Sequence, residues 1–347
     1  MNPEPRNQQD GSTDVEELGL APRGTAARRT TKLAVVGAGS VGATLAYAAL
    51  MRGAARSVAL YDIDAKKVEA EALDIGHGLQ FMPMADIVGS DDIAVCADAD
   101  VVVVTAGAKQ KPGQSRLDLA EATVGLMRAV MPRLVDVAPE AIYVMVTNPV
   151  DIVTYAALKI SGLPSNQLFG SGTVLDSSRL RYLLAQHTGI AAQNIHAYIA
   201  GEHGDSEIPL WSSASIGAVP LMDWPGLVDE GGTVRGRLQD EDRQRIAEEV
   251  VTSAYRIIEG KGATNYAVAL AASRIIEAIL NDERRILPVS SLLEGYRGIS
   301  DVCLSVPSVV GGRGVEGRLE VRMSPEELEG LMTSAEAVRS VARDLGL

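Results

Sequence analysis

One histidine of the chain has the setting of a group that exchanges a proton with a ligand. The chain contains four histidines, and His203 lies in the segment IAGEHGDSEIPL, between glycines and acids at the end of an apolar run. A side chain at a strand end is open to a ligand, and a near-neutral pKa suits an imidazole to giving and taking a proton. The alternative is an ordinary turn histidine, and only its partner residues distinguish the two interpretations.

Two possible partners of this histidine lie in the segment GSGTVLDSSRLR. Asp176 and Arg179 are three positions apart, so on a helix they share a face. A carboxylate beside an imidazole fixes its tautomer and stabilises the imidazolium, while an arginine binds a carboxylate through two parallel hydrogen bonds. The pattern predicts an acid–base pair next to a carboxylate clamp. The alternative is a surface ion pair that contributes little.

A glycine-rich turn predicts a dinucleotide site. Gly37, Gly39 and Gly42 form G-x-G-x-x-G directly after an apolar run and at the start of a helix-like segment. Such glycines permit a tight turn, close approach of a pyrophosphate and close packing of the helix on the strand. Asp62 follows at about the 20-residue offset of the acid that holds a ribose 2′-hydroxyl, which favours NAD over NADP. The alternatives are another nucleotide and an aspartate that merely ends its strand.

The order of elements indicates the scaffold that positions these groups. Continuously apolar runs predict strands buried on both faces, and the helical segments between them imply a parallel sheet with right-handed crossovers. The expected strands are 32–36, 57–61, 101–105 and 142–147, with helices such as 41–52 and 116–137. After about residue 170, helices are expected at 176–188, 238–258 and 263–281, with strand pairs near 194–200 and 206–210 and near 301–310 and 316–323.

This order predicts an α/β protein, with a Rossmann-type doubly wound parallel sheet followed by an α+β substrate-binding and catalytic domain. The expected division is a disordered tail at 1–30, the NAD-binding domain at 31–170 and the catalytic domain at 171–347. Ser324, Pro325 and Glu327 predict the start of a last helix through an N-cap, a first-turn proline and a capping box.

Composition restricts the possible partners. A net charge of −13 and a pI of about 4.9 argue against nucleic acid, and no apolar run approaches the ~18 residues of a membrane span. Cys96 and Cys303 lie in apolar, strand-like runs, so we expect buried thiols and a reducing compartment. Arg28 and Arg29 suggest a twin-arginine export signal, but glycines interrupt the apolar run that follows.

The chain closely resembles the bacterial L-lactate dehydrogenases of the lactate/malate dehydrogenase superfamily. The resemblance runs from about Lys32 to Leu347 and excludes the first 30 residues. Its motifs, taken in order, are highly specific. They are GAGSVG, TAGAKQKPGQSR, VTNPVD, GSGTVLDSSRLR, GEHGDSEIP and GISDVCLSVPSVVG.

The resemblance implies a role for each matching residue. His203 is expected to donate the proton to the carbonyl of pyruvate, with Asp176 pairing with it and raising its pKa. Arg179 is expected to bind the substrate carboxylate, and Arg116 to polarise the carbonyl when a mobile loop closes. Asn148 would position the nicotinamide and the reacting oxygen, Thr264 would line the pocket beside the substrate methyl, and the Asn148–Pro149 bond is expected to be cis. The expected cofactor-binding residues are Gly37, Ala38, Gly39, Ser40, Val41, Gly42, Asp62, Thr105, Ala106, Gly107, Val146 and Asn148.

Gln110, six residues before Arg116, bears on substrate choice. By resemblance its position faces the far end of the substrate, where lactate dehydrogenases have glutamine and malate dehydrogenases have arginine. An unpaired second carboxylate buried there costs several kcal/mol, so pyruvate is favoured over oxaloacetate. Lys109 or Lys111 could instead supply a cation, although solvated loop lysines are commoner.

A second constellation, Arg181 and His196, predicts regulation. Many bacterial lactate dehydrogenases have these residue types at a subunit interface that binds fructose 1,6-bisphosphate. Two symmetry-related copies would surround the bisphosphate with four cationic groups. The alternative is a pair of interface residues without a ligand.

The resemblance therefore implies a cytoplasmic, NAD-dependent L-lactate dehydrogenase, an oxidoreductase expected to be a homotetramer. It would reduce pyruvate reversibly to (S)-lactate in the last step of fermentative glycolysis. Pyruvate and lactate are the expected partners, with fructose 1,6-bisphosphate as a possible effector; no metal, membrane or nucleic-acid partner is expected. The alternatives are a malate or other 2-hydroxyacid dehydrogenase, a non-catalytic NAD sensor, and a nucleotide-sugar or methyl-transfer enzyme.

Overall fold

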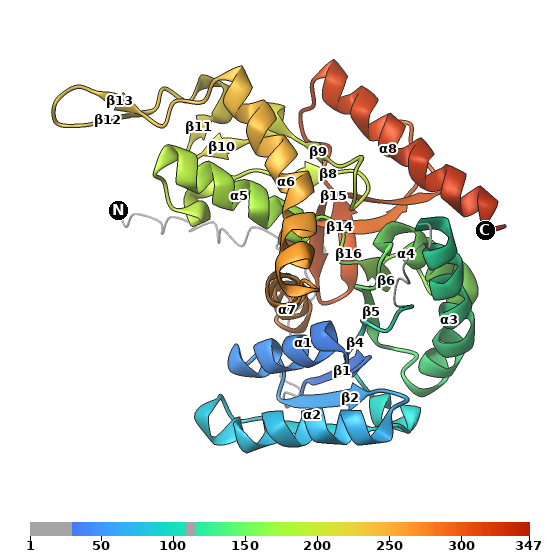
Figure 1. Ribbon diagram of the computed structural model, residues 1–347. Helices are drawn as coiled ribbons and strands as arrows, with labels where there is room; N and C mark the ends of the chain where they lie inside the picture. Colours follow the sequence, from blue (N-terminus) through green and yellow to red (C-terminus); the bar gives the residue numbers. More distant parts are fainter. Residues whose placement is uncertain (1–29, 109–115) are drawn as a thin grey trace, which may run out of the picture. The chain divides into compact units, whose positions relative to one another are not determined.

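The structure is a computed structural model that describes residues 30–108 and 116–347, with Arg116 described only in its backbone. Residues 31–347 form one compact unit. Its first half alternates strands and helices (Figure 1). The elements are β1 (Lys32–Val36), α1 (Ser40–Met51), β2 (Ser57–Tyr61), α2 (Ala65–His77), β3 (Asp86–Ser90), β4 (Val101–Val104), α3 (Arg116–Val137), β5 (Ile142–Met145), α4 (Val150–Ser161) and β6 (Leu168–Gly170).

The second half holds longer helices and a group of short strands. Its main elements are α5 (Val174–Thr188), β7 (Ile195–His196), β8 (Ile199–Ala200), β9 (Ile208–Pro209), α6 (Asp240–Lys261), α7 (Tyr266–Leu280), β14 (Arg285–Leu293), β15 (Val302–Gly311), β16 (Gly314–Arg318) and α8 (Pro325–Asp344). Short pairs are formed by β10 (Ser215–Ile216) with β11 (Val219–Pro220), and by β12 (Leu227–Val228) with β13 (Val234–Arg235).

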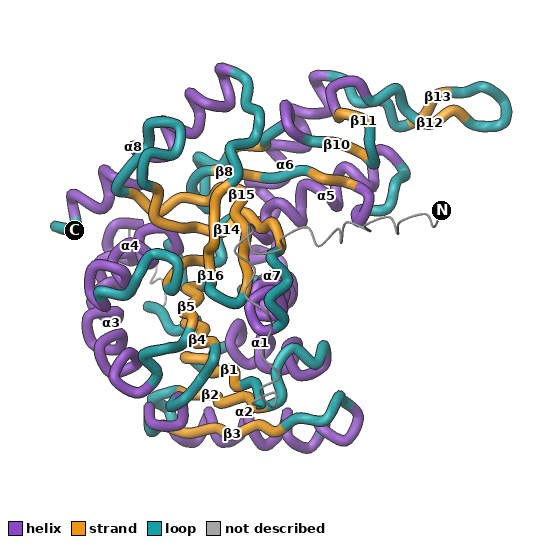
Figure 2. The backbone as a smooth tube through the Cα atoms, turned by 180° about the vertical axis from the view of Figure 1, so that it is seen from behind, coloured by secondary structure: helices purple, strands orange, loops and turns teal. Residues whose placement is uncertain are grey.

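The main sheet of the described chain has the strand order β16-β15-β14-β6-β5-β4-β1-β2-β3. Pairing is parallel from β6 to β3, which confirms the predicted doubly wound sheet. The strands β14, β15 and β16 extend it antiparallel, and β14 pairs with β6 through Ser290 and Gly170. The second half therefore continues the first sheet rather than building only a separate one, as Figure 2 shows from behind.

Alternate residues of the central strands enter two different cores, so the parallel strands are covered on both faces. On β1, Leu33 and Val35 belong to a core with residues of α1 and α7, while Ala34 and Val36 belong to one with residues of α3 and α4. Figure 1 shows these helix pairs on opposite sides of the sheet. A third core joins α5 and α6 to the short strands. Among the described residues, no helix is both long and apolar enough to cross a membrane.

Several predicted boundaries need correction. The strand predicted at 101–105 ends at Val104, because the backbone N–H groups of Thr105 and Ala106 both donate to Val36 O, at 2.8 and 2.9 Å. The strand predicted at 142–147 ends at Met145. Cys96 is buried and free, as is Cys303, but it lies in a 3₁₀ turn, Ile93–Cys96, rather than in a strand.

Candidate active site

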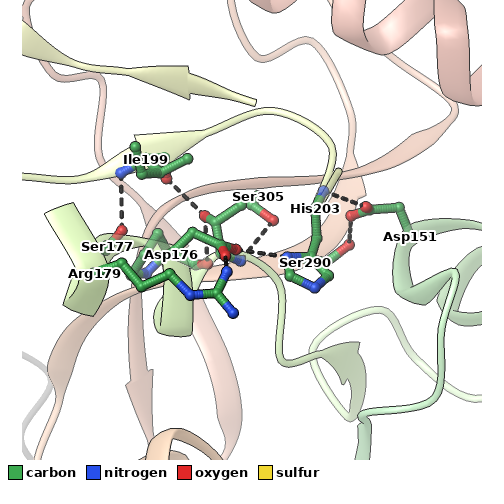
Figure 3. Close-up of polar contacts among 10 residues, drawn as sticks. Asp151, Asp176, Ser177, Arg179, Ile199, His203, Ser290 and Ser305 are labelled. Atoms are coloured by element: carbon green, nitrogen blue, oxygen red, sulfur yellow. Dashed lines mark hydrogen bonds and ion pairs between the residues drawn. The ribbon is translucent and has the colours of Figure 1, made fainter. Parts of the chain in front are cut away.

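The centre of the site is a chain of three charged side chains from two segments (Figure 3). His203 Nδ1–H donates to Asp176 Oδ2 at 2.5 Å, and Arg179 Nη1 donates to Asp176 Oδ1 at 2.5 Å. The Asp176 side chain is 1% exposed, whereas those of Arg179 and His203 are 15% and 23% exposed. One buried carboxylate therefore holds an imidazole and a guanidinium that remain open to a ligand, and it contacts His203 through Nδ1 rather than Nε2.

The start of α5 explains why Asp176 and Arg179 lie together. The helix begins at Val174, two residues before the predicted start, so both side chains project from its first two turns. Asp176 lies near the positive end of the helix dipole, which stabilises its negative charge. The predicted sharing of one helix face is observed directly in the hydrogen bond between the two side chains.

The electrostatics of the pair favour a protonated imidazole beside an ionised carboxylate. Burial alone lowers the pKa of His203, but neighbouring carboxylates, chiefly that of Asp176, raise it to about 9. Burial likewise raises the pKa of Asp176, but the charges of His203 and Arg179 outweigh it and the net pKa is lowered. The imidazole of His203 is therefore expected to carry its second proton at neutral pH.

Asp151 holds the backbone of His203, a role that was not predicted from the sequence. It lies in the first turn of α4, 2% exposed, and its Oδ2 accepts the backbone N–H of His203 at 2.8 Å. Its Oδ1 accepts from Ser290 Oγ at 2.5 Å. Burial, partly offset by these hydrogen bonds, raises the pKa of Asp151 to about 6. The one signal in the sequence that could have indicated this buried role is the position of an acid within the apolar run VDIVTYAAL.

The strand that precedes His203 is held from two directions. Ile199 of β8 donates its N–H to Ser177 Oγ at 2.8 Å, and its carbonyl accepts from Thr173 Oγ1 at 2.6 Å. Gly201 pairs with Ser305 of β15 in an antiparallel bridge. These contacts join α5, β8 and the main sheet, so the distance between His203 and Asp176 is set by rigid elements.

The glycine loop between β1 and α1 fits a dinucleotide. Gly37 has φ +105°, and a Cβ there would lie 2.8 Å from Ala106 N. A Cβ at Gly42 would lie 1.8 Å from Gly37 O, so the helix packs too closely on the turn for any side chain. At Gly39, by contrast, a Cβ would meet no described atom within 4 Å. The fold itself therefore does not require glycine at 39, but the approach of a pyrophosphate would.

The other predicted cofactor residues surround this loop. Ala38 N–H donates to Asp62 Oδ2 at 2.6 Å, which places the acid at the end of β2 beside the glycine turn. Ser40 and Val41 open α1. Thr105 Oγ1 donates to Gly37 O at 3.0 Å. Ala106, Gly107, Val146 and Asn148 follow the carboxyl ends of β4 and β5, where open α/β sheets bind ligands, and the Asn148–Pro149 bond is cis.

The remaining predicted residues are placed only in part. Gln110 lies outside the described residues, as do Lys109, Lys111 and the side chain of Arg116. Thr264 is half-buried in the connection between α6 and α7. The next residue, Asn265, donates to Thr44 Oγ1 of α1 at 3.0 Å, so this connection is tied to the helix of the glycine loop.

The predicted effector residues contact other groups than His203 and Asp176 in the described chain. Arg181, on α5, donates from Nε to Ala197 O at 2.9 Å, and its guanidinium lies 5.0 Å from the ring centre of Tyr198. Burial lowers the pKa of Arg181, although the group remains a cation. His196 is exposed on β7, where it pairs with Ser215.

Comparison with known proteins agrees with this arrangement. Residues 31–170 match the model of the lactate/malate dehydrogenase NAD-binding domain, and residues 173–344 match that of the alpha/beta C-terminal domain. An L-lactate dehydrogenase of Bifidobacterium animalis is 57% identical over 92% of this chain and 98% of its own length. One from Acetivibrio thermocellus is 44% identical over 91% and 98%, respectively.

Solved structures give the same result. A lactate dehydrogenase from a Medee basin deep-sea metagenome is 38% identical, with a TM-score of 0.86 over 92% of this chain and all of its own. The minor L-lactate dehydrogenase of Enterococcus mundtii, in its ligands-bound form, is 36% identical, with a TM-score of 0.85 over 91% and 98% of the two chains. With both family domains matched along the chain, and with His203 and Asp176 in contact, this chain belongs to the lactate/malate dehydrogenase family of NAD-dependent oxidoreductases.

Proposed function

We propose that this chain is an L-lactate dehydrogenase that reduces pyruvate to (S)-lactate with NADH, and catalyses the reverse reaction. The observation that carries the proposal is the chain Arg179–Asp176–His203, which combines a carboxylate-binding cation with a proton donor around one buried anion. Residues 31–170 are assigned to the cofactor and 171–347 to the substrate and its chemistry. Relatives named L-lactate dehydrogenase over almost the whole chain support the choice of substrate.

The residues of the site act on pyruvate as follows. Bound NADH supplies the hydride that reduces the carbonyl carbon. His203 Nε2–H gives its proton to the carbonyl oxygen, while Nδ1–H stays on Asp176 and keeps the ring oriented. Arg179 uses one N–H on Asp176, and its other donors are available to the substrate carboxylate. In lactate oxidation, neutral His203 takes the hydroxyl proton instead.

Four further assignments rest on the sequence. Arg116 is proposed to polarise the carbonyl, Asn148 to position the nicotinamide and the reacting oxygen, Thr264 to line the pocket beside the substrate methyl, and Gln110 to face that methyl. A second carboxylate would meet an amide there and remain unpaired.

The test of the function is NADH oxidation with pyruvate and with oxaloacetate. We expect kcat/KM for pyruvate to exceed that for oxaloacetate by at least tens-fold, because an unpaired buried charge costs several kcal/mol. A preference for oxaloacetate would overturn the assignment and support a malate dehydrogenase, with Lys109 or Lys111 as the missing cation. The absence of turnover with any keto acid would support a non-catalytic NAD-binding protein.

We also propose that the chain acts as a homotetramer in the cytoplasm. Large apolar side chains remain exposed on several helices of the described chain, α1, α2, α6 and α7 among them, which is the pattern of a surface that a second copy covers. They include Tyr47 and Met51 of α1, Leu73 of α2, Tyr255 and Ile258 of α6, and Tyr266 and Leu270 of α7. The cytoplasm supplies NADH and pyruvate, and it agrees with two free buried thiols.

Fructose 1,6-bisphosphate is the proposed effector, bound between copies by Arg181 and His196. Arg181 is held by Ala197 O and the Tyr198 ring, so its charge has a fixed position near the exposed His196. We expect the effector to lower the KM for pyruvate in the parent and to have at least tenfold less effect in Arg181→Gln, because a typical allosteric coupling is worth 5- to 150-fold. Equal activation of both proteins, measured as KM against effector concentration, would contradict this site.

A further inference from the structure

One acid beside the catalytic pair has no part in the mechanism given so far. Glu207 lies in the loop between β8 and β9, four residues after His203. An Asp176 oxygen, a ring nitrogen of His203 and a Glu207 oxygen all lie within 4.8 Å of one another. Glu207 Oε1 is buried and has no hydrogen-bond partner among the described residues. A buried carboxyl next to a second carboxylate requires a physical explanation.

The surroundings of Glu207 disfavour its charge. The residue lines a cavity of about 290 Å³ between the β8–β9 hairpin and α6, where most of the wall is apolar. The lining residues besides Glu207 are Ile199, Pro209, Ala247, Glu248, Val251 and Thr252. Burial against this wall, reinforced by the negative charge of Asp176, raises the pKa of Glu207 to about 9, although His203 and Arg179 oppose the shift. This shift favours the neutral carboxylic acid at pH 7.

The Asp176 carboxylate can accept a further hydrogen bond, which a neutral Glu207 could donate. Asp176 Oδ2 accepts from His203 and Oδ1 accepts from Arg179, but each carboxylate oxygen has a second lone pair. A carboxylic acid has one O–H to donate, and Glu207 is close enough to Asp176 for the two carboxyl groups to interact. Ionised, the same group would instead repel Asp176 in a site of low dielectric.

We propose that Glu207 is a positioning residue of the acid–base centre, whose neutral carboxyl group donates a hydrogen bond to Asp176 and holds it against His203. The inference rests on the proposed lactate dehydrogenase function and adds a third donor to the buried anion. Asp176 then carries one negative charge shared by the histidine, the arginine and the acid. Removing the acid frees Asp176 to turn, and the imidazole loses its fixed direction.

The other charged groups near Glu207 do not change this assignment. On α6, Glu248 lines the same cavity but is exposed. In the same loop, Glu202 Oε2 accepts from Ser206 Oγ at 2.5 Å, so its carboxylate is already hydrogen-bonded there. Asp151 is engaged by the His203 backbone and by Ser290. A cation between Asp176, His203 and Glu207 is disfavoured because Arg179 already places a positive charge on Asp176.

The protonation state of Glu207 is tested first, by a measurement that does not require catalytic turnover. Infrared difference spectra of the full-length parent and Glu207→Gln at pH 7 should show the carbonyl band of one neutral carboxylic acid, present in the parent and lost in the variant. Glu248→Gln, which changes an exposed acid of the same cavity, should leave this band in place. If Glu207→Gln removes only carboxylate bands, Glu207 is ionised and the proposal fails. This result does not depend on whether the enzyme uses pyruvate.

The hydrogen bond is then tested by activity. Glu207→Leu should lower kcat/KM for pyruvate about 5- to 100-fold, because a lost buried hydrogen bond costs about 1–3 kcal/mol. Glu207→Gln should recover most of that loss, since its amide is neutral and can donate.

Two outcomes would overturn the positioning role. One is a Glu207→Leu variant that keeps the kcat/KM of the parent, since Asp176 would then hold His203 without the acid. The other is equal loss in the Gln and Leu variants. If Glu207→Leu does not fold, the infrared band and the kcat/KM of Glu207→Gln, compared with that of the parent, decide the question. A parent inactive on every keto acid would refute the proposed function, while the infrared result would still stand.

Discussion

Replacement of His203 by asparagine is expected to lower kcat for pyruvate reduction by about 10²- to 10⁴-fold, the range that general acid catalysis supplies. Asparagine keeps a polar side chain of modest size, but it cannot deliver a proton. NADH binding, followed by fluorescence titration, should be unchanged, because the glycine loop and Asp62 lie on other elements. A His203→Asn variant with more than a tenth of the parent kcat would remove the histidine from the mechanism.

The pH profile gives the same assignment an independent check. The pKa of His203 is raised to about 9, so the imidazolium needed for reduction is present at neutral pH and is lost above that value. We expect kcat/KM for pyruvate to be level near pH 7 and to fall at higher pH, whereas lactate oxidation should rise over the same range. Because Asp176 is the main group that raises this pKa, Asp176→Asn should move both limbs toward the ordinary histidine value of 6.5. If both pH profiles of Asp176→Asn change at the same pH as those of the parent, Asp176 does not raise the pKa of His203.

The second large effect is expected at the carboxylate clamp. Arg179→Lys keeps a positive charge but loses the planar fork, which binds a carboxylate through two parallel hydrogen bonds. We expect kcat/KM for pyruvate to fall about 30-fold or more, since loss of a buried charged hydrogen bond costs about 2–5 kcal/mol. Most of the loss should appear as a higher KM, and it should be measured by steady-state kinetics beside NADH titration.

A matched control variant separates a loss of substrate binding from a general loss of stability. Arg343→Lys changes an exposed arginine of α8 that pairs with Glu336, and it should leave kinetics and melting temperature unchanged. If Arg179→Lys also keeps the KM of the parent, the substrate carboxylate is bound elsewhere. A lower melting temperature with an unchanged KM would assign Arg179 to stabilising Asp176 alone.

The sequence by itself determined the local features of this protein. The bounds of β1 and β2 follow from short apolar runs, and α8 begins where Ser324, Pro325 and Glu327 predict, with the capping box present. The glycine pattern and the acid after β2 predicted a dinucleotide turn, because Gly37 needs a positive φ, Gly42 packs against Gly37 O, and Gly39 leaves room for the ligand. Asp176 and Arg179 could be paired because a helix has a fixed period.

Only the tertiary structure decided which distant groups share the site. The strand β14 carries Pro288 and two adjacent serines, so its pattern does not predict a strand, yet it pairs along its length with β15 and joins the main sheet at β6. Its Ser290 reaches Asp151, which in turn holds the His203 backbone. Glu207 becomes a neutral acid only because α6 and β9 enclose it next to Asp176. Burial and long-range contact set these properties, and neither is encoded in the spacing of neighbouring residues.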